Sequence, residues 1–260
     1  MKKQVLVFLL IFYPFIIYSQ QNLGSAKTMK EDIYILSCFI SDSNNEWSYD
    51  EKMDIFNKYH EAVNWLKNQA LRYNITVNFE GGNFGLNTDI KLSNIEYGSG
   101  RGNEDVNMVS RVLKKIGYDN SLSFYNWVIG NTKCRNALVL IFVKGKGTSY
   151  AMVFETKDMN EDYYFVEGVM LYESYLNGNK LASSSIAHEI LHLFGAWDFY
   201  KTFQQTQDKE DKAKELFPNS IMLRTSFNIN ELYIDDVTAW LIGWKSSMET
   251  WYEWFNPNKK

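Results

Sequence analysis

Short runs of apolar residues recur along the chain, and most of them have the length and composition of β-strands. Residues 137–143 are apolar throughout, which indicates a strand that is buried on both faces of a sheet. Residues 149–155 alternate between apolar and polar side chains, as in a half-buried strand at a sheet edge. The other strands that the pattern predicts are 32–40, 75–80 and 166–172.

Helical periodicity separates these strands. Ser48 and Glu51 have the spacing of a capping box, and the apolar residues after them recur at helical intervals to about Tyr73. Residues 81–103 are rich in glycine and asparagine and predict a long loop, and the polar run 204–215 predicts a solvated loop or a short helix. The order of the elements predicts a single α/β domain, with further helices at 104–116, 183–194 and 230–242.

Residues 1–20 have the features of a secretory signal peptide. Lys2 and Lys3 precede an apolar stretch at 5–18, and Ser19 is a small residue suited to the position before a cleavage site. The stretch is shorter than the roughly 20 residues that span a bilayer, so a transmembrane anchor is the alternative with less support. We expect cleavage near residues 19–20, a mature chain of 21–260 with no stable membrane anchor, and a secreted or periplasmic location.

Composition narrows the chemistry that the chain can perform. The 260 residues carry a net charge of −4, so they offer no basic field that would hold nucleic acid. Export would bring Cys38 and Cys134 into an oxidising compartment, where they either pair or remain two buried thiols. The sequence has three histidines, so a histidine-based metal site must draw on His60, His188 and His192.

The segment 187–198, AHEILHLFGAWD, carries the strongest chemical signal. His188 and His192 are four residues apart and share one face of the predicted helix, where both imidazoles can bind one zinc ion. Glu189 is adjacent to the first of these ligands and can act as general base toward a water at the metal. Gly195 can adopt a positive φ angle after the helix, so the chain can turn and bring Asp198 back toward the metal.

These residues resemble the metzincin zinc metallopeptidases, whose pattern is HExxHxxGxx followed by a third ligand and a methionine turn. His188, Glu189, His192 and Gly195 match this pattern, and Met222 lies in the turn-like segment that follows Pro218. The element order resembles the adamalysin-like branch. The resemblance implies a mixed twisted sheet with an active-site helix, an N-terminal subdomain to about residue 195 and a mostly helical C-terminal subdomain at 196–260.

One ligand position departs from most metzincins. Their third ligand is histidine, whereas this chain has Asp198, which resembles the snapalysin-type variant. His60 lies on the first predicted helix and is expected to be an ordinary surface or packing residue, so the third ligand must be an oxygen. Asp198 is the placed candidate, and Tyr200 or another carboxylate is the alternative. The position two residues after Met222 holds Arg224, so no oxyanion-stabilising tyrosine is expected there.

The resemblance implies one catalytic zinc ion and a protein or peptide substrate that pairs with the edge strand. Gly147, Tyr150 and Ala151 are the predicted substrate contacts. Met222 is expected to be a packed, structural thioether beneath the ligands. No calcium loop is recognisable, and we expect a monomer. A catalytically silent zinc-containing binding protein and a zinc hydrolase of a non-peptide bond are the alternative functions.

Overall fold

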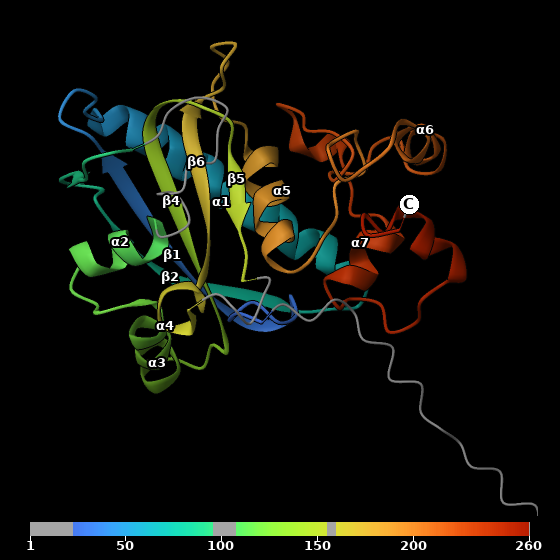
Figure 1. The fold of residues 1–260 in the computed structure, drawn as a ribbon, viewed down its shortest axis with the longest axis horizontal. Coiled ribbons are helices and arrows are strands. Elements are labelled where there is room, and N and C mark those ends of the chain that lie inside the picture. The colour runs from blue at the N-terminus through green and yellow to red at the C-terminus, as the bar shows by residue number, and fades with distance from the viewer. Residues whose placement is uncertain (1–22, 96–107, 155–159, 260) are drawn as a thin grey trace, which may run out of the picture.

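A six-stranded mixed sheet forms the centre of the protein (Figure 1). The computed structural model describes residues 23–95, 108–154 and 160–259. The strand order is β2-β1-β4-β6-β5 with β3 also beside β1; β5 is antiparallel to β6, and the other paired strands are parallel. The strands are Glu31–Ser41 (β1), Val77–Phe84 (β2), Ile90–Lys91 (β3), Asn136–Lys146 (β4), Tyr150–Met152 (β5) and Glu167–Ser174 (β6).

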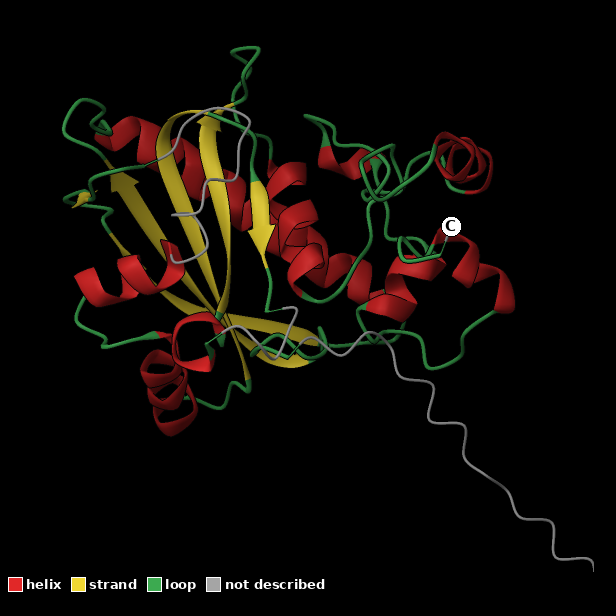
Figure 2. Ribbon diagram, in the orientation of Figure 1, coloured by secondary structure: helices red, strands yellow, loops and turns green. Residues whose placement is uncertain are grey.

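Helices cover both faces of this sheet, as Figure 2 shows. Successive residues of a strand point to opposite faces. Ile33 and Ile35 of β1 pack in one apolar cluster with α1 and α5, whereas Leu36 packs in a second cluster with α2 and α3. The helices are Tyr49–Leu71 (α1), Met108–Lys115 (α2), Ser121–Asn131 (α3), Glu161–Tyr164 (α4), Ser183–Leu193 (α5), Gln207–Leu216 (α6) and Asp236–Leu241 (α7), with 3-10 helices at Ile229–Glu231 and Thr250–Phe255.

The predicted α/β fold is confirmed. The strands predicted at 32–40 and 137–143 lie within β1 and β4, and α1 begins at Tyr49 behind a complete capping box of Ser48 and Glu51. The helix predicted at 183–194 is α5, and the polar run 204–215 forms most of α6. The chain after α5 is mostly helix and loop and lies beyond α5 from the sheet in Figure 1. The subdomain boundary near residue 195 stays a prediction.

The long loop predicted at 81–103 is wrong in its first part, because β2 continues to Phe84. Gly81 pairs with Ile35 of β1, and a Cβ atom at Gly81 would lie 2.0 Å from the carbonyl oxygen of Ile35. Glycine therefore permits a close approach of two backbones here and does not mark a turn. Residues 96–103 lie outside the described part of the chain, as do residues 104–107 of the next predicted helix.

The helix predicted at 230–242 is also wrong in its first half. Tyr233 is extended and forms a parallel bridge with Ser220. Asp235 is the N-cap of α7, and its carboxylate accepts a hydrogen bond of 2.9 Å from the backbone N–H of Thr238. Helix α3 is absent from the elements that the sequence predicts. It begins after a reciprocal cap between Asn120 and Ser123.

The two cysteines are both buried and free. Cys38 is opposite Ile141 in the parallel pairing of β1 and β4, whereas Cys134 precedes the start of β4. Cys134 is thus separated from the partner of Cys38 by seven residues, on the order of 20 Å along a strand. A disulfide needs Cα atoms within about 7 Å of each other. Of the two alternatives, the structure supports two buried thiols.

The predicted signal peptide, residues 1–20, lies outside the described residues. Within residues 23–95, 108–154 and 160–259, the structure has no helix that is long and apolar enough to cross a membrane. Export and cleavage near residues 19–20 stay predictions from the sequence.

Residues 23–30, the first described residues, form a strap past the starts of β4 and β6 and are held by the buried carboxyl group of Glu167. Glu167 of β6 is only 2% exposed, and its two carboxylate oxygens accept hydrogen bonds from the backbone N–H groups of Ala26, at 2.9 Å, and Phe154, at 3.2 Å. A Cβ atom at Gly24 would lie 2.5 Å from the Glu167 carboxyl carbon, so the strap lies directly against this group. Burial outweighs the two hydrogen bonds and raises the pKa of Glu167 to about 8.

This raised pKa makes a prediction about stability. In the unfolded chain Glu167 ionises near its ordinary pKa of 4.5, whereas in the folded protein it stays protonated to about pH 8. The folded state therefore binds more protons, and the free energy of unfolding should fall as the pH rises between these values, by up to ~1.4 kcal/mol per pH unit. Urea denaturation of the wild type and Glu167→Gln between pH 4.5 and pH 9 tests this. The wild type should lose stability relative to the variant as the pH rises; parallel curves would contradict the assignment.

Candidate metal centre

Helix α5 carries His188, Glu189 and His192 on the edge of the apolar layer that it shares with α1. His188 is 4% exposed and Glu189 is 9% exposed. The helix ends at Leu193 with Phe194 as its C-cap, and Gly195 has a φ angle of +91°, as its position in the sequence predicts. This turn reverses the chain and brings Asp198 back toward the two imidazoles.

Three potential ligand atoms converge at this point. The Nε2 atoms of His188 and His192 are 3.1 Å apart. Asp198 Oδ1 is 3.2 Å from His188 Nε2 and 3.1 Å from His192 Nε2. Among the described residues, this is the one group of three or more histidine, cysteine or acidic side chains that could hold a metal ion. The structure thus brings together the three residues that the sequence predicts as ligands.

The hydrogen bond that Nδ1 of each imidazole makes determines whether the Nε2 atom of the same ring carries a proton. His188 Nδ1 lies 2.9 Å from the carbonyl oxygen of Ile221, and His192 Nδ1 lies 2.8 Å from that of Ala196. A carbonyl oxygen only accepts hydrogen bonds, so both Nδ1 atoms must carry the proton. In the neutral imidazoles both Nε2 atoms then present lone pairs. This is the second-shell arrangement of metal-binding histidines.

The donor set and its spacing fit zinc. Nitrogen and oxygen ligands about 2.0–2.1 Å from a tetrahedral ion lie about 3.3–3.4 Å from one another, close to the three distances observed. Asp198 Oδ1 is also buried and has no hydrogen-bond partner in the described structure. With both imidazoles neutral, these three electron-rich atoms face one another, so either a proton on an imidazole nitrogen or a metal ion must lie among them.

The charges of these side chains are coupled. Burial disfavours the charged form of His192, but the Asp198 carboxylate outweighs that effect and raises the pKa of His192 to about 9. Burial also opposes ionisation of Asp198, yet the attraction of the two imidazoles holds the pKa of Asp198 well below its usual range. The carboxylate is therefore ionised at neutral pH, which is the state that binds a metal.

The predicted methionine turn supports the first ligand. Met222 is fully buried, and its carbonyl oxygen accepts a hydrogen bond of 2.9 Å from the backbone N–H of Phe199, the residue after Asp198. The side chain of Ser220 bonds the buried carboxylate of Asp235 at 2.6 Å. Ile221, the residue after Ser220, supplies the carbonyl oxygen to His188. A continuous series of contacts therefore leads from Asp235 through Ser220 and Ile221 to the imidazole. Asp235 is a supporting residue that the sequence analysis missed.

The ligand His188 lines a cavity of about 280 Å³. Glu189 lines it, as does Arg224 two residues after Met222. Tyr200 also lines it: its ring stacks on His188 at 6.1 Å between centroids. Burial, the charges of Asp198 and Glu189, and a hydrogen bond to Asp198 raise the pKa of the Tyr200 hydroxyl. The sequence offers Tyr200 only as an alternative ligand, whereas in the structure Tyr200 is a protonated donor beside Asp198.

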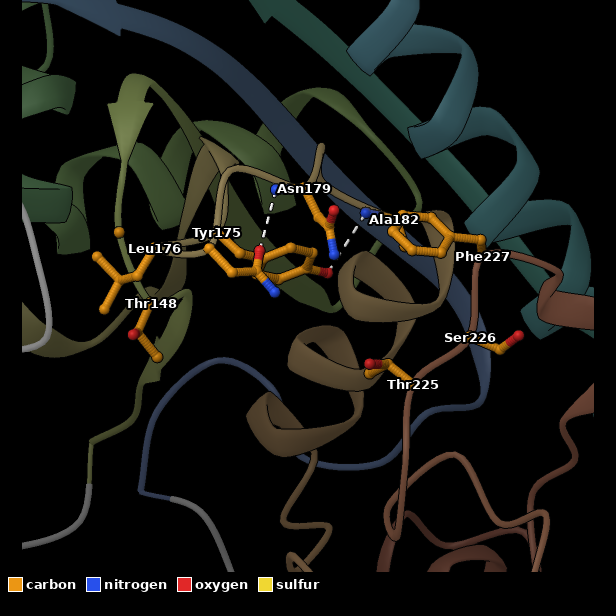
Figure 3. A pocket seen from close by; sticks show the side chains of 10 residues that line it. Thr148, Tyr175, Leu176, Asn179, Ala182, Thr225, Ser226 and Phe227 are labelled. Carbon is orange, nitrogen blue, oxygen red and sulfur yellow. Dashed lines mark hydrogen bonds between the residues drawn. The ribbon is translucent and has the colours of Figure 1, made fainter.

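The predicted substrate contacts fall into two groups. Gly147 lines a neighbouring cavity of about 480 Å³, shown in Figure 3. Tyr150 and Ala151 lie in β5, the last strand of the sheet, but line neither cavity. The edge strand predicted at 149–155 is shorter than expected, Tyr150–Met152, and residue 155 lies outside the described part of the chain.

His60 lies elsewhere in the protein. Its ring is exposed on α1 and packs edge-on against Phe56, with 4.5 Å between centroids. This is the surface and packing position that the sequence predicts, and it makes His60 a matched control for the histidine ligands.

Comparison with protein-family models finds none that matches this chain, and none of the curated proteins matches it either. A functional assignment therefore rests on the geometry of the centre and on the sequence motif.

Removing one ligand should abolish metal retention. We expect the wild type to hold about one zinc ion per chain and His192→Ala to lose zinc affinity by more than about 100-fold, because changes outside the ligand shell alone cost 10–100-fold. Zinc content after dialysis against a weak chelator measures this. His60→Ala, the control, should keep the metal. Full zinc occupancy in His192→Ala would show that the centre is assigned to the wrong residues.

The Tyr200 hydroxyl should matter without being a ligand. Tyr200→Phe removes a donor to Asp198 but keeps the ring on His188, so we expect zinc to stay bound with an affinity lowered about 10-fold. Competition with a chromophoric chelator gives the two dissociation constants. An unchanged zinc affinity would contradict a role for this hydrogen bond, and complete loss of zinc would indicate that Tyr200 is itself a ligand.

Proposed function

We propose that the protein is an exported zinc-dependent endopeptidase. The observation that carries this proposal is the convergence of His188 Nε2, His192 Nε2 and Asp198 Oδ1, at a place where His188 and Glu189 line a cavity. Three protein ligands with room for a further one characterise catalytic zinc sites, whereas structural sites use four. When bound, zinc supplies a Lewis acid that activates water and polarises a carbonyl group.

Glu189 is the general base in this proposal. It follows a ligand directly in the sequence and lines the same cavity, so its carboxylate can take the proton of an attacking water. The same carboxylate can then deliver this proton to the amine that leaves when the peptide bond breaks. A purely structural metal site has no use for this residue, which argues against a catalytically silent binding protein.

The shape of the surroundings favours an extended substrate. The cavity at the ligands and the larger one beside it share Thr148, Tyr175 and Thr225, so they form one elongated cleft. Residues 148–149, which lead into β5, form part of one wall. A peptide in extended conformation fits a cleft beside the last strand of a sheet. None of residues 23–30 lines either cavity, so the described strap leaves the cleft open.

Tyr200 adds a hydrogen-bond donor to the lining of the cavity, and Arg224 adds a positive charge. The Tyr200 hydroxyl stays protonated because its pKa is raised, so it can donate a hydrogen bond at neutral pH. The Arg224 guanidinium is always charged, and its side chain is 45% exposed. Both groups can stabilise negative charge that develops on a substrate oxygen during attack.

Removing the Glu189 carboxylate should separate metal binding from catalysis. We expect Glu189→Ala to retain zinc but to lower kcat/KM for peptide cleavage by about 10²–10⁴-fold, the usual contribution of a general base. Cleavage of unfolded casein and of a peptide library by the zinc-loaded protein measures this. The control, Glu215→Ala, removes an exposed carboxylate of α6 and should leave activity unchanged. If wild type and Glu189→Ala both bind zinc and neither cleaves any peptide, the peptidase proposal fails.

A further inference from the structure

The peptide group that joins Asp198 to Phe199 is hydrogen-bonded at both ends. Its N–H donates to the carbonyl oxygen of Met222 at 2.9 Å, and its carbonyl oxygen accepts a hydrogen bond of 2.8 Å from Nε2 of Gln205. A peptide group is planar and includes the Cα atoms on either side of it. The two bonds therefore fix the plane that contains the Cα atom of Asp198, from which the carboxylate projects toward the two imidazoles.

Gln205 reaches this peptide group from the loop that precedes α6, and its side chain is only 3% exposed. The loop is closed on itself, because the backbone N–H of Gln205 donates to Thr202 Oγ1 at 3.0 Å. The same Nε2 atom of Gln205 also donates to the carbonyl oxygen of Phe255 at 2.8 Å. Both protons of the amide nitrogen are thus used, one on the segment of Asp198 and one on the C-terminal 3-10 helix.

The C-terminal 3-10 helix is held in place by other contacts. The Phe255 ring is fully buried and lies 5.2 Å from the ring of Phe199, between centroids. Lys209 of α6 is 6% exposed, and its ammonium group donates to the carbonyl oxygens of Asn256, at 2.7 Å, and Lys259, at 2.8 Å. The carbonyl group of Phe255 is therefore a fixed point against which the Gln205 amide can hold another segment.

We propose that Gln205 is a positioning residue for the third zinc ligand. Asp198 lies between α5 and α6 in a segment that forms neither helix nor strand, so hydrogen bonds from other parts of the chain determine where its backbone lies. The amide cannot turn over, since its oxygen would then face two carbonyl oxygens. The proposal rests on the proposed function, because it takes Asp198 as a ligand of the catalytic zinc ion.

Gln205→Met separates positioning of the ligand from packing. Methionine fills a similar volume but has no N–H group, so the peptide group after Asp198 loses one of its two bonds. We expect zinc affinity to fall about 10- to 100-fold, the usual cost of removing a partner outside the ligand shell. Competition with a chromophoric chelator measures the dissociation constants. Gln205→Asn keeps an amide that is too short to reach both carbonyl groups; it should show a smaller loss and decides the question if the methionine variant does not fold.

The matched control is Asn136→Leu, which also replaces a buried amide with an apolar side chain. Asn136 is 7% exposed, and its Oδ1 atom accepts a hydrogen bond of 2.9 Å from the backbone N–H of Lys27 in the strap. Urea denaturation of the metal-free proteins shows how much stability each variant loses. Asn136→Leu should keep the wild-type zinc affinity whatever stability it loses.

The geometry of the bound metal gives a readout that a loss of stability does not move. With Co²⁺ in place of zinc, the visible absorption of the ion reports the number and arrangement of its ligands. At saturating cobalt, we expect the bands of Gln205→Met to differ from those of the wild type in position and intensity. The bands of Asn136→Leu should match those of the wild type.

The outcomes distinguish this proposal from the peptidase proposal, because none of the measurements depends on cleavage. If the wild type binds zinc but cleaves no peptide, only the peptidase proposal fails, and a weaker, altered metal site in Gln205→Met still supports positioning. Unchanged zinc affinity with an unchanged cobalt spectrum in Gln205→Met would overturn the role of Gln205, as would an equal loss of affinity in Asn136→Leu. A wild type that binds no zinc would overturn both proposals.

Discussion

Two imidazole nitrogens and a carboxylate oxygen face one another at the end of α5, all within 3.2 Å. Each imidazole gives its only proton to a backbone carbonyl on the other side of the ring, so no hydrogen bond can form between the three acceptors in their neutral-imidazole state. A cation resolves this repulsion. The arrangement also ties the chain after α5 to that helix, because the carbonyl groups that orient the imidazoles come from Ala196 and Ile221.

The remainder of the protein holds these two carbonyl groups in place. Gly195 turns the chain so that Ala196 lies beside His192, and the buried Asp235 accepts a hydrogen bond from Ser220, the residue before Ile221. The sheet contributes indirectly, since the apolar layer between β1, α1 and α5 fixes the helix that carries both histidines. The C-terminal region therefore covers part of the hydrophobic core and also supplies the hydrogen bonds that hold the two imidazoles in place.

Sequence reasoning succeeded where the geometry is local. The shared face of His188 and His192 follows from helical spacing, the role of Glu189 from its place beside His188 in the motif, and Gly195 from the conformation that a helix end requires. Elimination led to Asp198, because the third histidine, His60, lies on another helix. The supporting residues could not be found in this way, since they depend on long-range contacts.

The secondary-structure elements that the sequence predicts wrongly also depend on contacts between distant parts of the chain. Gly81 belongs to the segment 81–103, whose composition predicts a loop, but the neighbouring strand comes so close that only glycine fits. Residues 232–234 look helical in sequence, yet Tyr233 is drawn into a bridge with Ser220. Helix α3 is rich in aromatic and β-branched residues, which hides its periodicity, and its cap of Asn120 with Ser123 was the available signal.

X-ray absorption at the zinc edge of the metal-loaded protein tests the central claim most directly, because it identifies the ligand atoms themselves. The account predicts a first shell of nitrogen and oxygen at about 2.0–2.1 Å, with the outer-shell scattering of two imidazole rings. A sulfur ligand at about 2.3 Å, or scattering from no imidazole or only one, would contradict a centre built from His188, His192 and Asp198.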